Sequence, residues 1–418
     1  MRVRITTIAR WIVYFTMITS LSLLKPLGEI LSMPFFSFDY AVRWTNIALI
    51  ILSVILVMLK MRKRLVTGYI WGMVGLIVAT FILRLTIDFM IGRNVYKEMN
   101  LHSQYLYPIL AITIYALLEK KEIKLRRLID MIIALTMMSF ALRAGISLIY
   151  SWTGRRVLSS IALESAAENW IRDGVLRINP PCFSMIMVPL CMYQIETETE
   201  RKKRLYYFAA LASTILYSAC VHRARSITIY QVLEMLFVIY IKKRNTIGKI
   251  IMFLLGCIGI GILVGSGALD QLADIFNANN ELYSFSNSIR YIMYPYYFNM
   301  FLDHFWLGSG MLLGNELTFY SRIGTGALSD VGLLRTLVML GSGMLTFFVV
   351  FFIRGYVTGI KTLDKTKDPA DRILTLGIIF SVMLTVINID CFFPIYAYAM
   401  PFCLAIPEYI ITRGCSEK

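Results

Sequence analysis

Long apolar runs alternate with short polar segments along almost the whole chain. This pattern is typical of helices that cross a membrane, because a helix in a bilayer can present apolar side chains on every face. Twelve runs can be recognised, and several are shorter than the roughly 20 residues that a crossing needs, so we expect them to extend into their flanks. The runs cover residues 11–24, 44–59, 65–83, 105–118, 128–150, 178–195, 205–221, 227–241, 250–263, 331–353, 373–389 and 393–411. The sequence therefore predicts an all-α polytopic membrane protein with about 12 transmembrane helices.

The polar segments between the runs differ greatly in length. The longest covers residues 264–330, and a second long segment covers residues 151–177. Apolar residues at helical spacing predict a helix over 161–171 and an amphipathic helix over 288–305, while glycines at 308, 310 and 314 indicate turns. We expect residues 1–418 to form one integral membrane domain whose specific work is concentrated in the longest loop.

Lysine and arginine are divided unequally between the polar segments. They concentrate in residues 2–10, 60–64, 120–127, 201–204, 242–249, 354–372 and the C-terminal tail. Because basic loops stay in the cytoplasm, both termini are predicted to be cytoplasmic and both long segments to face the outer side. Hydrophobic residues make up 58% of the chain, so this asymmetry, rather than nucleic-acid binding, explains the net charge of +16. The first run lacks a signal-peptide cleavage site and is expected to remain as a span.

No familiar motif for a metal or cofactor stands in a credible context. The chain has no H-E-x-x-H, C-x-x-C, Walker A or G-x-G-x-x-G motif there, and no D-x-D pair on an outer loop. The seven cysteines lie mostly in apolar runs, where small buried hydrophobic residues are expected rather than a disulfide or metal framework. We therefore expect no metal and no cofactor, so that any chemistry would draw on a substrate that is already activated.

Several arginines occupy outer positions where positive charge is statistically disfavoured. They are Arg84, Arg143, Arg177, Arg225, Arg290 and Arg335. Each could snorkel or pair with a nearby acid, as Arg84 could with Asp88 four residues later. As a group at one depth near the outer surface they predict an anion site, because the planar guanidinium makes two hydrogen bonds to phosphate. A lipid-linked diphosphate is the obvious large anion at that depth.

The histidines and many aromatic residues also lie on the predicted outer side. His222 opens the turn H-R-A-R-S (222–226) close to Arg225, where it could act as a structural hydrogen-bonding group or as a base. The Tyr, Phe and Trp residues between 291 and 306 fit a membrane interface, although aromatic faces also stack on sugar rings.

Five short motifs follow one another between residues 175 and 343. They are V-L-R-I-N-P-P (175–181), R-A-R-S-I (223–227), S-I-R-Y (288–291), F-L-D-H-F-W-L-G-S-G (301–310) and S-D-V-G-L-L-R-T-L-V-M-L-G-S-G (329–343). Together they resemble the O-antigen polymerase and ligase family of bacterial membrane glycosyltransferases (Wzy and its relatives), where an Asp or His opens a helix that meets a glycine eleven residues later. Asp330 and Gly341 have this spacing. Ligases open the last motif with His-Asn, so Ser329-Asp330 favours a polymerase, while Phe305-Trp306 stands where a proline is common.

The resemblance implies a metal-independent, GT-C-like glycosyltransferase of the bacterial inner membrane that polymerises O antigen or another surface polysaccharide. Donor and acceptor would be oligosaccharides linked to undecaprenyl diphosphate, and a flippase and a chain-length regulator would be partners. The resemblance implies that Arg177, Arg225 and Arg290 neutralise the departing diphosphate, with Arg143, Arg335 and His222 as further substrate-binding residues. Asp330 would join Arg290 in catalysis by orienting or deprotonating the acceptor hydroxyl, or it would instead cap a helix.

Other functions fit part of this pattern. A flippase or transporter of lipid-linked oligosaccharides would also have about 12 helices with buried arginines, but it should show two-fold repetition and charges at the bilayer midplane. An O-antigen ligase would share the fold of the polymerase. A non-enzymatic assembly partner of the glycan export machinery would have no need of the arginines.

Overall fold

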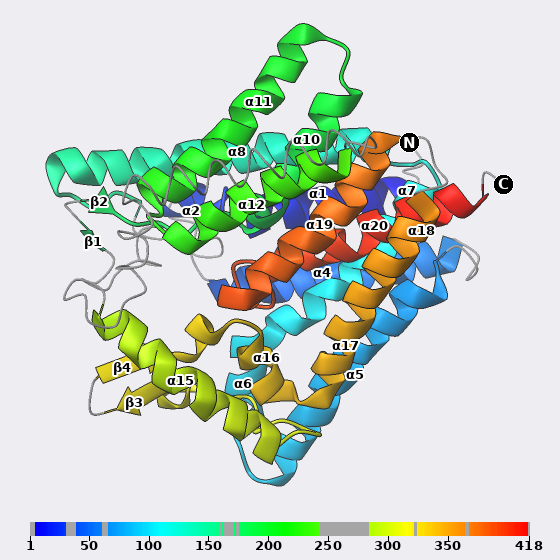
Figure 1. Cartoon of the computed structure of the whole chain (residues 1–418). Coiled ribbons are helices and arrows are strands. Elements are labelled where there is room, and N and C mark those ends of the chain that lie inside the picture. Colours follow the sequence, from blue (N-terminus) through cyan, green and yellow to red (C-terminus); the bar gives the residue numbers. More distant parts are fainter. Residues whose placement is uncertain are drawn as a thin grey trace.

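The computed structural model describes residues 5–30, 39–60, 66–158, 161, 171–172, 175–242, 284–321, 324–363 and 368–416. Most of these residues are helical (Figure 1). The first helices are α1 (Ile5–Ser20), α2 (Lys25–Ile30), α4 (Asp39–Lys60), α5 (Gly68–Met90), α6 (Val95–His102), α7 (Leu110–Glu119) and α8 (Leu125–Thr153). The later ones are α10 (Met187–Thr197), α11 (Arg201–Leu216), α12 (Arg225–Lys242), α15 (Ser284–Asp303), α16 (Leu333–Leu340), α17 (Ser342–Ile353), α18 (Gly359–Leu363), α19 (Pro369–Asn388) and α20 (Met400–Ser416).

Short 3-10 or π-helical segments connect several of these helices. They are η2 (Ser103–Ile109), η5 (Cys182–Ile186), η6 (Tyr217–Val221), η7 (Gly314–Leu317), η8 (Leu328–Val331), η9 (Arg354–Thr358) and η10 (Ala397–Ala399). Two small antiparallel hairpins are also present, β1 (Ile171–Arg172) with β2 (Val175–Leu176) and β3 (Thr318–Ser321) with β4 (Gly324–Ala327).

Seven helical segments among the described residues are long and apolar enough to cross a membrane. They are Ala41–Leu59, Gly68–Met90, Val95–Glu119, Leu125–Thr153, Arg201–Val221, Ser342–Lys361 and Pro369–Ile387. Only 28% of the first segment is buried, and Ile51, Ile55 and Leu59 on α4 are exposed. Apolar side chains on an outward face are expected where lipid is the solvent. The chain is therefore an all-α polytopic membrane protein, while the total of about 12 crossings stays a prediction.

Eleven of the twelve predicted runs overlap described helices, although the runs 178–195 and 393–411 begin several residues before them. Residues 250–263 lie outside the described part of the chain. The run 331–353 is not continuous, because it breaks at Gly341 between α16 and α17. The helix predicted over 161–171 is wrong at its end, since Ile171 pairs with Leu176 in the β1–β2 hairpin, and residues 162–170 are not described. The helix predicted over 288–305 is confirmed as α15, which spans Ser284–Asp303. It is not amphipathic as expected, because its exposed face is also apolar, with Ile292, Phe298 and Leu302.

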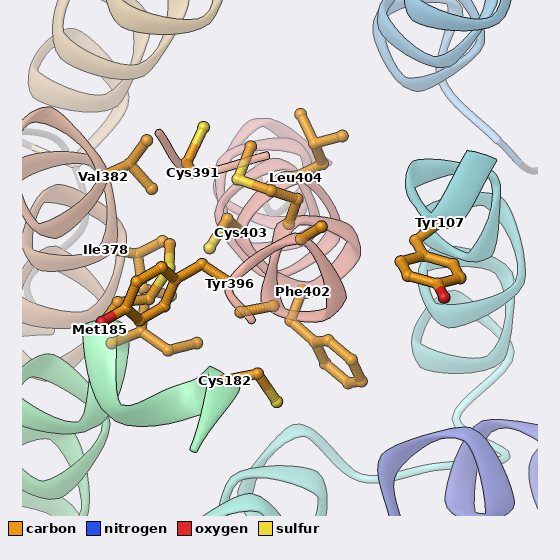
Figure 2. Packing of buried hydrophobic residues seen from close by; sticks show 14 of the residues in the cluster. Tyr107, Cys182, Met185, Ile378, Val382, Cys391, Tyr396, Phe402, Cys403 and Leu404 are labelled. Atoms are coloured by element: carbon orange, nitrogen blue, oxygen red, sulfur yellow. The ribbon is translucent and has the colours of Figure 1, made fainter. Parts of the chain in front are cut away.

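The helices share one large apolar core. Figure 2 shows its region around η5, α19 and α20, where Cys182, Val382 and Cys403 lie among buried apolar side chains. Four of the described cysteines, at positions 182, 191, 391 and 403, are buried as small hydrophobic residues, whereas Cys220 is exposed. The prediction for cysteine is thus confirmed at those four positions.

The elements of the long loop gather at one end of the helical bundle. In Figure 1, α15, β3 and β4 of this loop lie there together with α16, which follows the loop, and the ends of the chain lie at the opposite end. Gly326 lets β4 approach α15, because a Cβ at this position would lie 2.1 Å from the Sδ atom of Met293. This contact fixes the β3–β4 hairpin against the helix.

Candidate functional site

A cavity of about 270 Å³ opens at the end of the bundle that lies away from the chain termini. Its walls come from the end of α1, the start of α2 and α4, the middle of α8, the segment after β2 and the turn after α19. The lining residues are Thr19, Ser20, Ser22, Leu24, Lys25, Val42, Arg43, Arg143, Asn179, Cys182, Phe393, Pro394, Ile395 and Tyr398. Three of these described residues, Lys25, Arg43 and Arg143, are cations, and none is Asp or Glu. We call this site the basic cavity.

Arg143 is the most buried of the three cations, with 3% of its surface exposed. Its Nη1 donates to the carbonyl of Asn179 at 2.8 Å, and its Nε donates to the Oγ of Ser139 at 3.3 Å. Ser139 in turn donates to the carbonyl of Leu21 at 3.1 Å, which joins α8 to the end of α1. These bonds hold the guanidinium in one orientation beside the cavity, and this fixed orientation is what bidentate recognition of an oxyanion requires.

Lys25 and Arg43 are site residues that the sequence interpretation missed. Both are partly buried, on α2 and α4, and both fall in an outer segment of the predicted topology. Each resembles an ordinary interfacial charge, because it stands near the end of a helix. The available signal was that they flank the first two predicted spans on the same side as Arg143.

Arg177 and His222 lie next to one another. The Nε of Arg177 donates to the carbonyl of His222 at 2.8 Å, and Tyr217 donates to the carbonyl of Ile178 at 3.1 Å. Burial, together with the charges of Arg177 and Arg143, lowers the pKa of His222 to about 3. The structure therefore brings together three predicted residues, Arg143, Arg177 and His222, around Ile178 and Asn179. His222 is neutral at pH 7, and its backbone carbonyl holds Arg177.

Arg335 borders the basic cavity from the side of α16. Its Nη1 lies 3.5 Å from the Oδ2 of Asp390, and its guanidinium lies 5.2 Å from the centre of the Phe393 ring, which lines the cavity. Asp390 also accepts hydrogen bonds from Thr336 and from the backbone N–H of Phe392. The charge of Arg335 is thus compensated behind the wall of the cavity, and the residue supports that wall through Phe393.

Three predicted site residues remain: Asp330, Arg225 and Arg290. Asp330 lies in η8, where it accepts a hydrogen bond from Ser329 at 3.3 Å, and it is not among the described lining residues. The prediction that it caps a helix is wrong, because Gly332 occupies the N-cap of α16. Arg225 and Arg290 stand at the start of α12 and within α15, and their side chains lie outside the described part of the structure.

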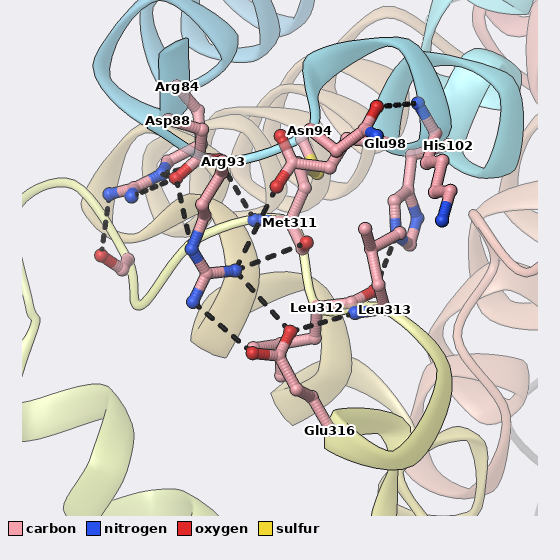
Figure 3. Close-up of polar contacts among 12 residues, drawn as sticks. Arg84, Asp88, Arg93, Asn94, Glu98, His102, Met311, Leu312, Leu313 and Glu316 are labelled. Carbon is pink, nitrogen blue, oxygen red and sulfur yellow. Dashed lines mark hydrogen bonds and ion pairs between the residues drawn. The ribbon is translucent and has the colours of Figure 1, made fainter. Parts of the chain in front are cut away.

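Arg84 belongs to a structural network rather than to the basic cavity (Figure 3). It pairs with Asp88 as the spacing predicts, and it donates to the carbonyl of Gly308 at 3.0 Å. Asp88 accepts the backbone N–H of Met311 at 3.1 Å. The pair therefore anchors the loop after α15 to the end of α5, with both charges satisfied.

The same loop is clamped to the break between α16 and α17. The N–H of Ser309 donates to the carbonyl of Val338 and that of Ser342 to the carbonyl of Phe305, both at 2.7 Å. A Cβ on Gly341 would lie 2.6 Å from the backbone nitrogen of Gly308, and both glycines have positive φ. Only glycine permits so close a contact between two backbones. The glycines at positions 308 and 341 are therefore explained by the packing of the loop against the helix break.

Within the residues that the structure describes, no three His, Cys, Asp or Glu side chains form a group that could hold a metal ion. No protein-family model matches this chain, and no curated protein is significantly similar to it.

Proposed function

We propose that the chain is a surface-polysaccharide polymerase of the bacterial inner membrane, joining oligosaccharide units carried on undecaprenyl diphosphate. The proposal rests on the motif resemblance and on one structural observation. Three cations, with no acid among the described lining residues, share one cavity at the end of the helical bundle. Cations gathered on one cavity wall create a positive potential there, and such a potential favours the binding of an anion.

The proposed reaction is a glycosyl transfer. The bond between the anomeric carbon of the donor glycan and its diphosphate breaks, and a hydroxyl oxygen of the acceptor forms the new glycosidic bond. Undecaprenyl diphosphate leaves, and the hydroxyl proton passes to a base or to solvent. Lys25, Arg43 and Arg143 would stabilise the negative charge that develops on the departing diphosphate, which is where preorganised cations accelerate such a reaction most. Asp330 remains our candidate for orienting the acceptor hydroxyl.

The Arg143→Gln variant tests this assignment in cells. In a strain lacking the native protein, wild type should restore a ladder of long glycans, and Arg143→Gln should leave single repeat units on the surface. Gln retains a donor for the Asn179 carbonyl but loses the charge, so membrane levels should stay comparable. The matched control is Arg156→Gln, at an exposed arginine beyond the end of α8, which should give the wild-type ladder. A normal ladder from Arg143→Gln would contradict the assignment.

Arg177 and Arg290 are tested in the same assay. We expect Arg177→Ala to shorten the glycan ladder because Arg177 lies beside His222 near Arg143, and Arg290→Ala to do so through the role that the resemblance implies. Unliganded lipid A core in the deletion strain would instead indicate a ligase. If either variant produced a full glycan ladder, the proposed contact of that arginine with the diphosphate would be wrong.

A specific observation favours the transporter alternative. Glu234 and Gln231 lie buried in the middle of α12, and both line a small cavity of about 20 Å³. A carboxyl at that depth is the kind of group that proton-coupled transport uses. If deletion of the protein, or Glu234→Gln, prevented glycan from reaching the outer surface, the flippase function would replace the polymerase function.

A further inference from the structure

A second cavity, of about 550 Å³, lies between α15, β3 and the loop that Arg84 and Asp88 anchor. Its volume falls in the range of natural small-molecule sites, roughly 300–1,000 Å³. Tyr296 and Tyr297 of α15 line it together with Phe319 and Tyr320 of β3, and Arg93 and Glu316 lie at its edge. We call it the aromatic groove.

The aromatic residues form two layers. Tyr297 and Phe319 are buried, and their ring centres lie 6.2 Å apart. Tyr296 is 51% exposed and Tyr320 is 63% exposed, and the ring of Tyr296 lies 5.0 Å from that of Phe319. The ring of Tyr296 therefore packs against the buried Phe319 while half of its surface stays exposed, and Tyr320, next along β3, is exposed as well. Rings that merely sit at a membrane interface would not need to converge from a helix and a strand on one cavity.

The polar edge of the groove is preorganised (Figure 3). Both terminal nitrogens of Arg93 donate to the carboxylate of Glu316, at 3.4 and 3.5 Å, and the N–H of Leu313 donates to the same carboxylate at 2.9 Å. The Glu316 side chain remains 48% exposed. A planar guanidinium and a planar carboxylate held side by side present donors and acceptors to paired hydroxyl groups. Ser309 also lines the groove, and its Oγ is a buried hydroxyl without a hydrogen-bond partner in the described structure.

Aromatic faces beside fixed polar groups match the two sides of a sugar ring, which has apolar C–H faces and hydroxyl groups around its rim. We propose that the aromatic groove binds sugar residues of the oligosaccharide substrate. This inference rests on the proposed function for the identity of the glycan. The backbone offers a connection between the two sites: Leu312 lines the groove, its carbonyl is hydrogen-bonded to Nε2 of His102 at 2.9 Å, and Arg43 and Arg335 act on His102 electrostatically.

Binding of a lipid-free glycan tests the groove directly. The probe is the oligosaccharide repeat unit released by mild acid from the lipid-linked pool of the producing strain, titrated calorimetrically into the purified full-length protein in detergent. Tyr296→Ala and Tyr320→Ala should each weaken binding about tenfold, and Tyr320→Phe, which keeps the ring, should bind within about twofold of wild type. The matched control is Phe298→Ala, at an exposed aromatic residue of α15 that is not among the described groove residues.

Unchanged affinity in both tyrosine-to-alanine variants, an equal loss in Phe298→Ala, or no binding by wild type would overturn the inference. Arg143→Gln separates this result from the proposed function, because it should bind the lipid-free probe as wild type does. If Arg143→Gln made a normal ladder while the tyrosine variants lost the probe, the basic cavity would lose its role and the groove would keep its own. If Arg143→Gln left single repeat units while the tyrosine variants bound the probe as wild type does, the basic cavity would keep its role and the groove would lose its own.

Discussion

Arg143 shows how one residue links the depth of a charge to its chemistry. Placing a guanidinium inside a membrane span costs several kcal/mol of free energy unless the group is paired or hydrated. Here Ser139 and the Asn179 carbonyl orient it, and the cavity on its other side holds further positive charge. The sequence predicted that Arg143 lies at a depth where an anion could bind. It did not predict the groups that orient Arg143, which lie 4 and 36 residues away in the sequence.

His222 makes a prediction about pH. The folded protein keeps its ring neutral because burial, Arg177 and Arg143 lower the pKa of His222 from 6.5 to about 3. The unfolded chain takes up a proton below its own pKa of roughly 6.5. The stability due to the neutral ring is therefore complete above pH ~6.5 and is lost as the pH falls towards ~3, by about 1.4 kcal/mol per pH unit.

The measurement is the thermal midpoint of the purified protein between pH 7.5 and 4.5. His222→Gln should flatten the decline on the acid side, while His304→Gln, at an exposed histidine, should retain the wild-type profile. Identical acid-side slopes for wild type and His222→Gln would rule out this source of acid sensitivity.

At the scale of elements, the break between α16 and α17 organises the long loop. The sequence predicts one continuous span there, because a glycine alone does not stop a membrane helix. The structure breaks the span at Gly341, whose φ of +71° and contact with Gly308 leave no room for a side chain. The helix α15, by contrast, was predictable from its local sequence. The sequence of a segment can predict the helix that it forms. A helix break that depends on contact with a distant backbone segment, as at Gly341, cannot be predicted from that segment alone.

Gly341→Ala should therefore destabilise the protein. A side chain at positive φ costs about 1–2 kcal/mol, and displacing the Gly308 backbone adds to this. We expect a lower thermal midpoint in detergent than for wild type. The control is Gly75→Ala in α5, where a Cβ would meet nothing within 4 Å, and this change should be neutral or slightly stabilising. Equal midpoints for the two variants would show that the Gly308–Gly341 contact does not determine stability.

At the scale of the whole molecule, the fold class followed from composition and periodicity, and the site did so only in part. The six outer arginines were expected to form one site, and of these Arg143 and Arg177 lie close enough to His222 to act on it electrostatically. Lys25 and Arg43 were not expected in the site, and Arg84 proved to anchor a loop instead. The difference is physical, because the topology of spans fixes the depth of a charge, while tertiary packing decides which charges at that depth share a cavity.

The central claim is that the basic cavity binds the diphosphate of a lipid-linked glycan and thereby promotes chain growth. Its most direct test uses purified protein in liposomes, supplied with the undecaprenyl-diphosphate-linked repeat unit and followed by gel separation of the glycans over time. Wild type and Arg156→Gln should both produce a growing ladder. Arg143→Gln, with an unchanged thermal midpoint, should elongate about 100-fold more slowly or worse. A folded Arg143→Gln that elongates at the wild-type rate, or a wild-type protein that produces no ladder, would contradict the account.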